Sequence, residues 1–553
     1  MSATHLTLSL AQYDFPVGAT AANAERIAEL AGAARDREHA DLVVFPELTL
    51  AGYPPDDLLL RPGFLRQQQA ASEALNAQLR GIEVLYGAAL KDEGPVADDP
   101  LVAHGLHNRL VWLHADGRVS THDKRELPNY SVFDDKRYYT PGSGVCVHEV
   151  QGVKVAVMIC EDSWFPTVAA ECKAAGAELL LIPNASPYCV GKEAQRLANL
   201  RQRVRETGLP LLAHNLIGGH DDVVYDGGAI ALNPDGSLAA LSPRFADGLY
   251  TLRWNRQTRC FETPAWHRLP DDDETGTTYH ALVRATRDYV EKNRFPGVLL
   301  GLSGGIDSAL TLAIAVDALG PERVQAYLLP SRYTAELSNI GAQQQARAMG
   351  VRHAILSIEG PFRAFLDTLA PSFAGRPVDL TEENLQSRCR GVLLMALSNK
   401  LGLMLLTTGN KSEVAVGYAT IYGDMCGGFA PLKDVYKTRV YALARWRNAA
   451  GPFPVIPEAV IERAPSAELR EDQTDQDSLP PYELLDAILE RFVEREQAEE
   501  EIIAAGFDAA TVRRVAQLVL RNEYKRRQSA PGPRVTPKAF GRERRYPITS
   551  GYR

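Results

Sequence analysis

Short apolar runs alternate with amphipathic segments along the first half of the chain. Residues 5–10 alternate apolar and polar side chains, and residues 41–45 and 153–159 are nearly continuous apolar runs, as expected of strands. Residues 21–34 and 167–175 carry apolar side chains at helical spacing. Further strands are predicted at 83–90 and 179–182, and a hairpin at 108–120. The alternation of strands and helices predicts an α/β domain.

The second half of the chain repeats a strand–helix rhythm, which predicts a doubly wound parallel sheet. Strands are predicted at 298–300, 324–329, 354–358 and 403–406. Helices are predicted at 279–292, 308–319, 335–349 and 382–401. The last of these helices is expected to start after Thr381 as its N-cap, with Glu382 and Glu383 in the first turn.

Between the halves, residues 261–278 contain two prolines and the acidic run 271–274, which predicts a linker. We therefore expect a first domain over residues 1–265, a linker over 266–278 and a second domain over 279–553. Two stretches of the second domain are predicted to be irregular. The glycine-rich residues 422–434 indicate a functional or mobile loop, and the acidic residues 468–477 indicate a surface turn or a disordered stretch.

Composition and charge narrow the possible partners. The 553 residues are 45% apolar, enough for more than one ordinary core, and the net charge of −9 argues against a general nucleic-acid binder. The charge is uneven, because residues 521–553 hold ten Lys or Arg against Glu523 and Glu543. This basic tail could contact an anionic substrate or a neighbouring subunit, or it could be a solvated terminus.

The seven cysteines are scattered, odd in number and form no C-x-x-C pair, which favours a reducing compartment over a disulfide frame or a zinc site. The N-terminus lacks a signal-peptide pattern, and no run of 18 apolar residues occurs. We therefore expect a cytoplasmic protein with no membrane partner.

The sequence GLSGGIDS at residues 301–308 follows a predicted strand and leads into a predicted helix. Free backbone N–H groups, the helix dipole and the hydroxyls of Ser303 and Ser308 make phosphate binding the expected use of such a turn. A Walker A loop would place Lys where Ile306 and Asp307 stand, so we expect a metal ion between Asp307 and phosphate oxygens. The alternative is a tight turn with incidental glycines. The run resembles the pyrophosphate loop of enzymes that cleave ATP between its α- and β-phosphates.

Three residues that follow predicted strands suggest nucleophilic catalysis: Glu47, Lys124 and Cys160. A cysteine attacks as a thiolate, so it needs a cation to lower its pKa and a base to accept its proton. Lys124 can supply the charge and steady an oxyanion, and Glu47 can serve as the base. The spacing alone is weak evidence, because a lone strand-end cysteine is more often a small buried hydrophobic residue.

The sequence motifs around these residues strengthen the interpretation that they are catalytic. Residues 45–48 (FPEL), 123–125 (DKR) and 159–162 (ICED) resemble the Glu–Lys–Cys motifs of the nitrilase family of carbon–nitrogen hydrolases, over roughly residues 5–250. The resemblance implies an αββα sandwich that hydrolyses an amide. Cys172 and Cys189 lack such a context and are interpreted as structural.

An amide hydrolase joined to an ATP-pyrophosphatase domain suggests a glutamine-dependent ligase, in which one half releases the ammonia that the other consumes. The whole chain resembles the bacterial glutamine-dependent NAD+ synthetases in residues 301–308, 381–391, 407–413, 422–438 and 521–528. The resemblance implies a carbon–nitrogen ligase that amidates deamido-NAD+ (nicotinate adenine dinucleotide) to NAD+ through an acyl-adenylate, releasing AMP, pyrophosphate and glutamate. The alternatives are another glutamine-dependent AMP-forming ligase, or a non-catalytic binding protein on the same fold.

The resemblance also implies roles for particular residues. Catalysis of glutamine hydrolysis falls to Glu47, Lys124 and Cys160, and glutamine binding to Tyr130, Ser186 and Lys192. ATP binding falls to Gly301, Leu302, Ser303, Gly304, Gly305, Ile306, Asp307, Ser308 and Thr408, and deamido-NAD binding to Asn384, Glu413 and Lys525. Asp307 and Glu413 would hold Mg2+, with ATP and deamido-NAD+ as substrates.

One residue departs from the family pattern. Asp135 stands where the family usually has a Glu, so we expect a water to fill the gap if this acid helps to position Lys124. The expected partners are small molecules, without nucleic acid or membrane, and we expect a homo-oligomer.

Overall fold

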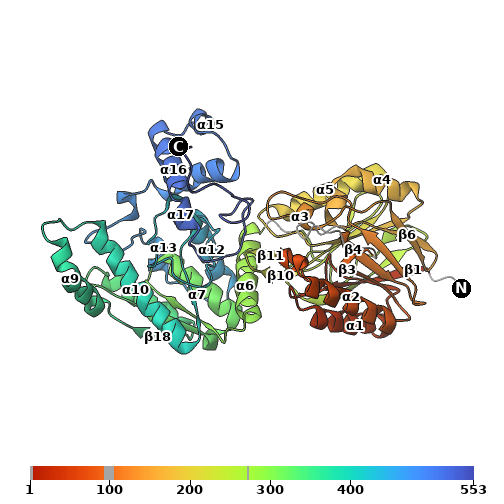
Figure 1. Cartoon of the computed structure of the whole chain (residues 1–553), viewed down its shortest axis with the longest axis horizontal. Helices are drawn as coiled ribbons and strands as arrows, with labels where there is room; N and C mark the ends of the chain where they lie inside the picture. Colours follow the sequence, from red (N-terminus) through yellow and green to blue (C-terminus); the bar gives the residue numbers. More distant parts are fainter. Residues whose placement is uncertain (1–3, 93–104, 271–272, 553) are drawn as a thin grey trace. The chain divides into compact units, whose positions relative to one another are not determined.

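The computed structural model describes residues 4–92, 105–270 and 273–552 (Figure 1). The chain divides into two units: Met1–His220 with Val224–Asp272, and Asp221–Val223 with Asp273–Arg553. Asp271 and Asp272 of the expected linker lie outside the described residues.

The first unit contains two large β-sheets. One has the strand order β15-β14-β1-β2-β3-β4-β5 and the other β13-β12-β9-β8-β7-β6. The strands of the first sheet are β1 (His5–Gln12), β2 (Leu42–Val44), β3 (Glu83–Lys91), β4 (Leu106–Leu113), β5 (Val119–Asp123), β14 (Gly248–Asn255) and β15 (Cys260–Phe261). Those of the second are β6 (Cys146–Val150), β7 (Val153–Val157), β8 (Leu179–Asn184), β9 (Leu211–Asn215), β12 (Ile230–Leu232) and β13 (Leu238–Leu241). A separate pair comprises β10 (Ile217–His220) and β11 (Val223–Asp226).

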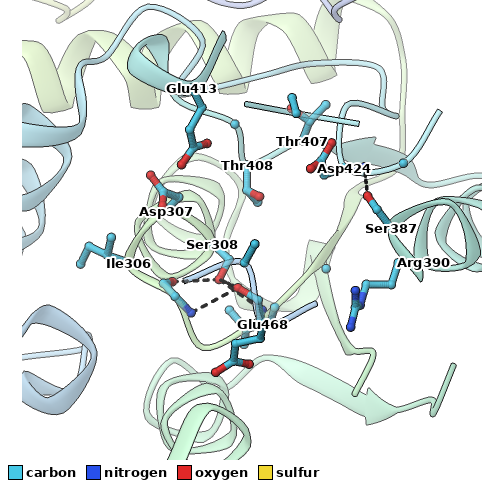
Figure 2. A pocket seen from close by; sticks show the side chains of 18 of the residues that line it. Ile306, Asp307, Ser308, Ser387, Arg390, Thr407, Thr408, Glu413, Asp424 and Glu468 are labelled. Atoms are coloured by element: carbon cyan, nitrogen blue, oxygen red, sulfur yellow. Dashed lines mark hydrogen bonds between the residues drawn. The ribbon is translucent and has the colours of Figure 1, made fainter. Parts of the chain in front are cut away.

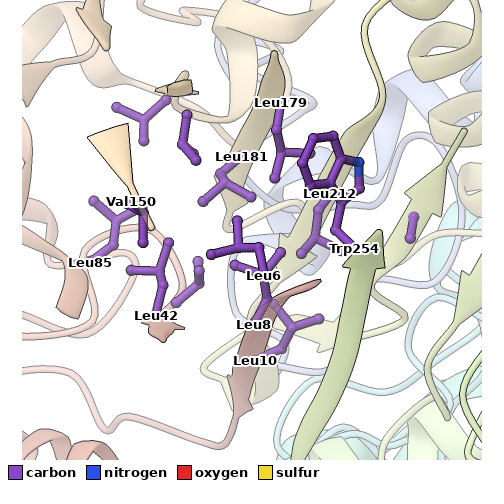
Figure 3. Packing of buried hydrophobic residues seen from close by; sticks show 14 of the residues in the cluster. Leu6, Leu8, Leu10, Leu42, Leu85, Val150, Leu179, Leu181, Leu212 and Trp254 are labelled. Atoms are coloured by element: carbon purple, nitrogen blue, oxygen red, sulfur yellow. The ribbon is translucent and has the colours of Figure 1, made fainter. Parts of the chain in front are cut away.

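Helices cover the outer faces of the two sheets. They are α1 (Thr20–Asp36), α2 (Pro62–Gln78), the short α3 (Asp135–Tyr138), α4 (Pro166–Ala174) and α5 (Lys192–Thr207), with 3-10 turns η1 (Asp56–Leu60) and η2 (Cys160–Trp164). In β8, Leu179 and Leu181 face the core between the sheets, shown in Figure 3, whereas Leu180 and Ile182 pack towards α4 and α5. Both faces of the strand are therefore buried, as its continuous apolar run indicated. The predicted αββα sandwich is confirmed.

The second unit is built on a parallel sheet with the strand order β18-β17-β16-β19. The strands are β16 (Val298–Gly301), β17 (Val324–Leu328), β18 (Arg352–Ile355) and β19 (Met404–Leu406), and all neighbours pair in parallel. The chain leaves β16 towards β17 and later returns to its other side as β19. This reversal of strand order is a topological switch point, where open α/β sheets place ligands at the carboxyl ends of the strands. The predicted doubly wound parallel sheet is confirmed.

Helices surround this sheet and extend beyond it. They are α6 (Glu274–Lys292), α7 (Ile306–Leu319), α8 (Glu336–Ala348), α9 (Glu359–Phe373), α10 (Leu380–Leu401), α11 (Lys411–Val416), α12 (Lys437–Ala450), α13 (Glu458–Glu462), α14 (Tyr482–Leu489), α15 (Glu499–Ala504), α16 (Ala509–Arg521) and α17 (Glu523–Arg526). Single turns are η3 (Pro321–Arg323), η4 (Asp475–Asp477) and the π-helical η5 (Glu490–Glu494). The helices α14 to α16 pack together around Leu485, Ile488 and Val515 as a separate apolar cluster.

Helices α6 and α10 begin earlier than the sequence predicted because acidic residues cap them. Helix α6 starts at Glu274 rather than Tyr279, because the Asp273 side chain accepts a hydrogen bond from the Gly276 N–H at 2.7 Å and so caps the helix. Helix α10 is capped by Asp379 rather than Thr381. The Asp379 carboxylate accepts from the Thr381 N–H at 2.7 Å and its own N–H donates to Glu382 at 2.9 Å. Acids predicted to lie in a linker or loop thus begin helices.

The basic tail folds back onto its own unit. The carboxylate of Glu523 binds Arg544 Nη1 at 2.6 Å and Arg526 Nη2 at 2.9 Å, and both guanidinium groups are buried. The interpretation of the tail as a solvated terminus is therefore wrong for this part, since its charges are paired inside the fold. No helix in the described part of the chain is long and apolar enough to cross a membrane.

Candidate active sites

The first candidate site lies where three strands of the first unit end. Glu47 follows β2, Lys124 directly follows β5, and Cys160 starts the η2 turn after β7. All three side chains are buried, with exposed fractions of 1% for Glu47 and Lys124 and 3% for Cys160. The fold therefore brings together residues that are 36 or more positions apart in the sequence.

Glu47 and Lys124 form a fully hydrogen-bonded buried pair. Lys124 Nζ lies 2.8 Å from Glu47 Oε1, which also accepts from Asn108 Nδ2 at 2.7 Å. The other oxygen, Glu47 Oε2, accepts from the Ala185 N–H at 2.9 Å. A buried carboxylate with three such partners is fixed in orientation, as a catalytic base requires.

Asp135 completes this cluster from the other side of the lysine. Its Oδ2 binds Lys124 Nζ directly at 2.7 Å. The expectation that a water would fill a gap here is wrong, because the short helix α3 carries Asp135 far enough towards Lys124 for direct contact. Burial raises the pKa of the Asp135 carboxyl, and the lysine opposes that rise. The carboxylates of Glu47 and Asp135 thus hold the Lys124 ammonium group in a fixed position.

The nucleophile candidate sits in an apolar environment. Burial raises the pKa of the Cys160 thiol well above its usual range; Glu47 adds to this rise, and Lys124 opposes it. The resting thiol is therefore protonated and needs a base to remove its proton as it attacks. The backbone of Cys160 has φ +42°, a left-handed conformation that side-chain-bearing residues rarely adopt. This sharp turn after β7 holds the thiol where the charges of Glu47 and Lys124 both act on it.

The three glutamine-binding candidates surround the same cluster. The half-exposed Tyr130 donates its hydroxyl to Glu161 at 3.0 Å, and Glu161 directly follows Cys160. Lys192 lies with its Nζ 4.5 Å from the centre of the Trp164 ring, and it lowers the pKa of the Glu161 carboxyl, which burial raises. Ser186 follows Ala185, whose N–H binds Glu47. Glu161 lies in the ICED motif at residues 159–162, but the sequence alone did not indicate a role for it.

The second candidate site is a cleft of about 310 Å3 in the second unit, at the carboxyl ends of β16 and β19 (Figure 2). Two loops form its floor: the predicted phosphate loop 301–308 and the loop 407–409 after β19. All nine ATP-binding candidates line it: Gly301, Leu302, Ser303, Gly304, Gly305, Ile306, Asp307, Ser308 and Thr408. The glycine-rich stretch 422–434 contributes Gly423, Asp424, Met425 and Cys426 to the wall. It is therefore a loop that shapes the cleft.

The phosphate loop is held in shape by its own serines. Ser308 Oγ accepts from the Ser303 N–H at 3.2 Å and donates to the Gly305 carbonyl at 2.9 Å, and the two hydroxyls lie 3.0 Å apart. Gly304 has φ +83° and passes so close to α8 that a Cβ would lie 2.2 Å from the Ser338 carbonyl oxygen. The loop needs glycine there for both reasons.

We expect Gly304→Ala to disable the second site with little change elsewhere. The methyl group would collide with the Ser338 backbone in a conformation that already disfavours alanine, so the loop must shift and ATP-dependent product formation should fall at least tenfold. Steady-state kinetics with varied ATP measure the effect. Gly360→Ala in α9 is the matched control, because a Cβ there meets open space and activity should be unchanged. Equal loss in both variants would contradict the role of the loop.

Two carboxylates of the cleft share one lysine. Asp307 Oδ2 lies 2.5 Å and Glu413 Oε1 3.2 Å from Lys437 Nζ, and Asn410 Nδ2 donates to Asp307 Oδ1 at 2.8 Å. Burial raises the pKa of Glu413 to about 8, with Asp307 and Asp475 adding to the rise and Lys437 opposing it. Three carboxyl groups thus lie near one ammonium group, and their mutual repulsion when ionised is what raises these pKa values together with burial. This oxygen-rich donor set fits a divalent cation such as Mg2+.

The deamido-NAD candidates are not brought together in the cleft. Glu413 lines it, whereas Asn384 and Lys525 are absent from its described lining. Asn384 accepts a hydrogen bond from Thr420 Oγ1 at 2.8 Å, and Lys525 Nζ donates to the carbonyls of Gly417 and Ala419 at 2.7 and 2.8 Å. Both therefore brace the segment 417–420, part of which forms the cleft wall. That Asn384, Glu413 and Lys525 bind deamido-NAD stays a prediction.

Several cleft residues were missed or misinterpreted from sequence. Glu468 accepts from Ser338 Oγ and from Arg463 Nη2, both at 2.7 Å, and lines the cleft together with Asp475. The prediction of a surface turn at 468–477 is thus wrong for these two residues. Asn410 and Lys437 lie in the motifs 407–413 and 422–438, but no role was predicted for either. The available signal was a polar or charged residue inside such a motif.

The chain matches two family models: carbon–nitrogen hydrolase over residues 7–259 and NAD synthase over residues 278–529. A glutamine-dependent NAD(+) synthetase of Xanthomonas campestris is 52% identical over 100% of this chain and 99% of its own length. One from Xylella fastidiosa is also 52% identical, over 99% of both chains. A solved glutamine-dependent NAD+ synthetase from Acinetobacter baumannii, in complex with ADP, superposes with a TM-score of 0.79 at 44% identity over 99% of both chains.

Proposed function

The chain belongs to the family of glutamine-dependent NAD(+) synthetases, and on this basis we propose how its two sites divide one reaction between them. The protein is a glutamine-hydrolysing carbon–nitrogen ligase that amidates deamido-NAD+ to NAD+ with ATP. Glutamine is hydrolysed in the first unit, and ATP and deamido-NAD+ react in the second. The observation that carries the proposal is the presence, in one chain, of a buried Cys–Lys–Glu cluster and a glycine-rich phosphate-loop cleft.

In the first unit, Cys160 attacks the side-chain amide of glutamine. Glu47 takes the thiol proton, which the raised pKa of the thiol makes necessary, and returns it to the departing ammonia. Lys124 Nζ, held between Glu47 and Asp135, stabilises the oxyanion of the tetrahedral intermediate. The resulting thioester is hydrolysed by water with Glu47 as the base, giving glutamate. Tyr130, Ser186 and Lys192 are proposed to bind the glutamine.

In the second unit, the loop 301–308 binds the ATP phosphates through its backbone N–H groups and the N-terminus of α7, and Thr408 contacts ATP from the other floor loop. The ADP complex of the Acinetobacter baumannii relative supports an adenine-nucleotide site. The nicotinate carboxylate of deamido-NAD+ attacks the α-phosphate and expels pyrophosphate. Ammonia then displaces AMP from the acyl-adenylate to form the amide of NAD+.

The carboxylates of Asp307 and Glu413 are proposed to hold Mg2+ (Figure 2). When bound, the ion supplies positive charge beside the phosphate oxygens. Lys437 Nζ lies between the two acids and neutralises part of their charge. Lys437 is thereby positioned to contact a phosphate oxygen at the edge of the same acid pair.

Deamido-NAD+ is proposed to bind along the wall that Asn384 and Lys525 brace. Lys525 fixes the carbonyls of Gly417 and Ala419, and burial lowers the pKa of its amine. Tyr418 and Ala419 of the same segment line the cleft. These contacts support an indirect part for Asn384 and Lys525, through the shape of the wall, and a direct one for Glu413.

A product assay tests the proposed function. The purified protein, given ATP, deamido-NAD+ and glutamine, should form NAD+, AMP, pyrophosphate and glutamate in equal amounts. Omission of deamido-NAD+ should stop AMP formation. Release of ADP and orthophosphate instead of AMP and pyrophosphate would overturn the acyl-adenylate route.

A homo-oligomer is proposed from an apolar surface on α9 and α10. Helix α9 buries Phe362 but leaves Phe365 42% exposed, and α10 exposes Val392 by 58%. Leu380 and Ile355, at the start of α10 and the end of the edge strand β18, are exposed as well. Exposed apolar side chains gathered on one part of a surface mark interaction sites in proteins. A second copy of the chain is the occupant that we propose.

We expect Phe365→Asp and Val392→Asp to release smaller species from the assembled protein. A carboxylate placed in an apolar interface loses its hydration without gaining a partner, which costs several kcal/mol per site. Sedimentation velocity at micromolar concentration measures the species. Val119→Asp on strand β5, also an exposed valine, is the matched control and should leave the size unchanged. A wild-type monomer, or variants of wild-type size, would contradict the proposal.

A further inference from the structure

The peptide groups on both sides of Ser186 are held by one side chain. Asn215, the last residue of β9, accepts from the Ser186 N–H with Oδ1 at 2.8 Å and donates from Nδ2 to the Ser186 carbonyl at 3.0 Å. These two bonds replace the strand pairing that ends at this point between β8 and β9. The backbone of a proposed glutamine-binding residue is thus fixed by a side chain from the neighbouring strand.

The amide of Asn215 is itself oriented by a buried ion pair. Its Nδ2 donates to Asp226 Oδ1 at 3.0 Å, and the second oxygen of Asp226 accepts from Arg196 Nη2. An amide has a donor end and an acceptor end, so the fixed carboxylate on one side decides which end faces Ser186. Arg196, Asp226 and Asn215 therefore form a directed chain of hydrogen bonds that ends on Ser186.

This chain is buried and reaches a small cavity. Asp226 is 1% exposed, Asn215 4% and Arg196 8%. A cavity of about 20 Å3 is lined by Ser186, Asn215 and Arg196 among others. Among the residues that the structure describes, Arg196 Nε and Nη1 have no hydrogen-bond partner, so its pairing with Asp226 is the polar contact that holds the side chain. In a low-dielectric site such a pair is strongly oriented.

The residue next to Ser186 connects this chain to the catalytic cluster. The Ala185 N–H donates to Glu47 Oε2 at 2.9 Å, and it also lowers the pKa of the Cys160 thiol. A displacement of the 185–186 backbone would therefore alter the contact with glutamine first and the orientation of Glu47 second. None of Arg196, Asp226 and Asn215 reaches Glu47 by a hydrogen bond among the described contacts.

We propose that Asn215, Asp226 and Arg196 are positioning residues for glutamine hydrolysis, which act by holding the Ser186 backbone in the geometry that binds glutamine. The inference rests on the proposed role of the first unit as the glutaminase. It also explains why a charged pair, Arg196 and Asp226, is buried behind the residues that are proposed to bind glutamine. Neither residue touches the substrate.

The test compares single and double variants of the full-length protein. Asn215→Asp places a carboxylate against Asp226 and the Ser186 carbonyl, and Asp226→Asn removes the group that orients Asn215. Each should raise the KM for glutamine at least tenfold with less than a threefold change in kcat. The double variant Asn215→Asp/Asp226→Asn restores a donor–acceptor pair between positions 215 and 226 but leaves a carboxylate facing the Ser186 carbonyl, which loses its donor, so the KM for glutamine should stay raised. A merely structural role would not confine the change to the KM for glutamine.

A second arginine of α5, Arg203, provides a matched control for Arg196. Arg203 lies on the same helix as Arg196, is 5% exposed, binds Glu206 at 2.9 Å through Nη2, and likewise has Nε and Nη1 unpartnered among the described residues. We expect Arg196→Lys to raise the KM for glutamine about tenfold and Arg203→Lys to leave it within twofold. NAD+ formation from ammonium salt should be unchanged in every variant.

The outcomes separate this inference from the proposed function. A wild-type protein without glutaminase activity would overturn both. A wild-type protein that hydrolyses glutamine, with single variants that keep its KM or a double variant that recovers the wild-type KM, would overturn the positioning role alone. Parallel losses with glutamine and with ammonium salt would show a general folding defect and would also overturn it.

Discussion

Cys160→Ala is expected to abolish NAD+ formation from glutamine while NAD+ formation from ammonium salt persists. The substitution removes the proposed nucleophile but leaves the phosphate loop and the Asp307–Glu413 pair of the second unit in place. Ammonia is the species that attacks the acyl-adenylate, so the remaining activity should rise with pH as more ammonia is unprotonated. A loss of at least 10³-fold with glutamine is the size expected for removal of a covalent nucleophile.

Initial rates of NAD+ formation with each nitrogen donor measure this separation. Cys172→Ala and Cys189→Ala are controls, since both thiols are buried but lie outside the Glu47–Lys124 contacts. They should keep both activities and lose about 1–2 kcal/mol of stability through packing. Glutamine-driven synthesis by ammonia-free Cys160→Ala protein would overturn the assignment of the first site.

Asp307→Asn is expected to lower NAD+ formation about 10²–10³-fold with either nitrogen donor, because it removes one of the two charges proposed to hold Mg2+. It also removes the carboxylate that binds Lys437 Nζ at 2.5 Å. The shape of the side chain is retained, so the start of α7 should keep its structure. Thioester formation at Cys160 needs no metal and should continue.

Two measurements define the outcome for Asp307. NAD+ formation is followed with ammonium salt at increasing Mg2+ concentration, and glutamate release is followed separately. Asp317→Asn lies on the same helix and breaks a structural pair with Arg447 at 2.5 Å, so it should lower the melting temperature but keep the Mg2+ dependence. Normal turnover by Asp307→Asn would reduce Asp307 to a residue of the first helical turn.

The parts of the fold that were predicted correctly have strong local signals. In β1 the alternation of Leu6, Leu8 and Leu10 with polar residues matches a strand with one face on the core. The strands of the second unit read as continuous apolar runs because helices cover both of their faces. The phosphate loop was visible because its function requires a particular order of glycines and hydroxyls within eight residues.

The parts that were missed depend on contacts between distant segments. Glu468 stands in an acidic stretch that looks solvated, but its carboxylate pairs with Arg463 and Ser338, the latter 130 residues away. Lys437 binds Asp307 across the same distance in sequence. Asn215, Asp226 and Arg196 have no spacing that would mark them, because their hydrogen bonds cross from strand to strand and to a helix. No periodicity reports such pairings, since they form only when the sheets are assembled.

The basic tail shows how composition misleads when charges are paired. Its excess of Lys and Arg indicated either a ligand contact or a solvated end. In the structure, part of that charge forms internal salt bridges, such as Arg534 with Glu543 and Arg544 with Glu523. Lys525 Nζ donates hydrogen bonds to the backbone carbonyls of Gly417 and Ala419, a use of its charge that the sequence did not indicate. A count of charges along a sequence does not distinguish these uses.

The left-handed backbone of Cys160 has a consequence for how this protein can be altered. Leu48, beside Glu47, shares that conformation with φ +49°, so the chain gives up conformational stability at the nucleophile and next to the base. Each such residue costs on the order of 1–3 kcal/mol that the surrounding sheets must offset. Selection or engineering for heat resistance alone would therefore favour glycine at position 160. Searches for hardier variants must screen for catalysis as well as for survival, since thermal tolerance and turnover oppose each other at this residue.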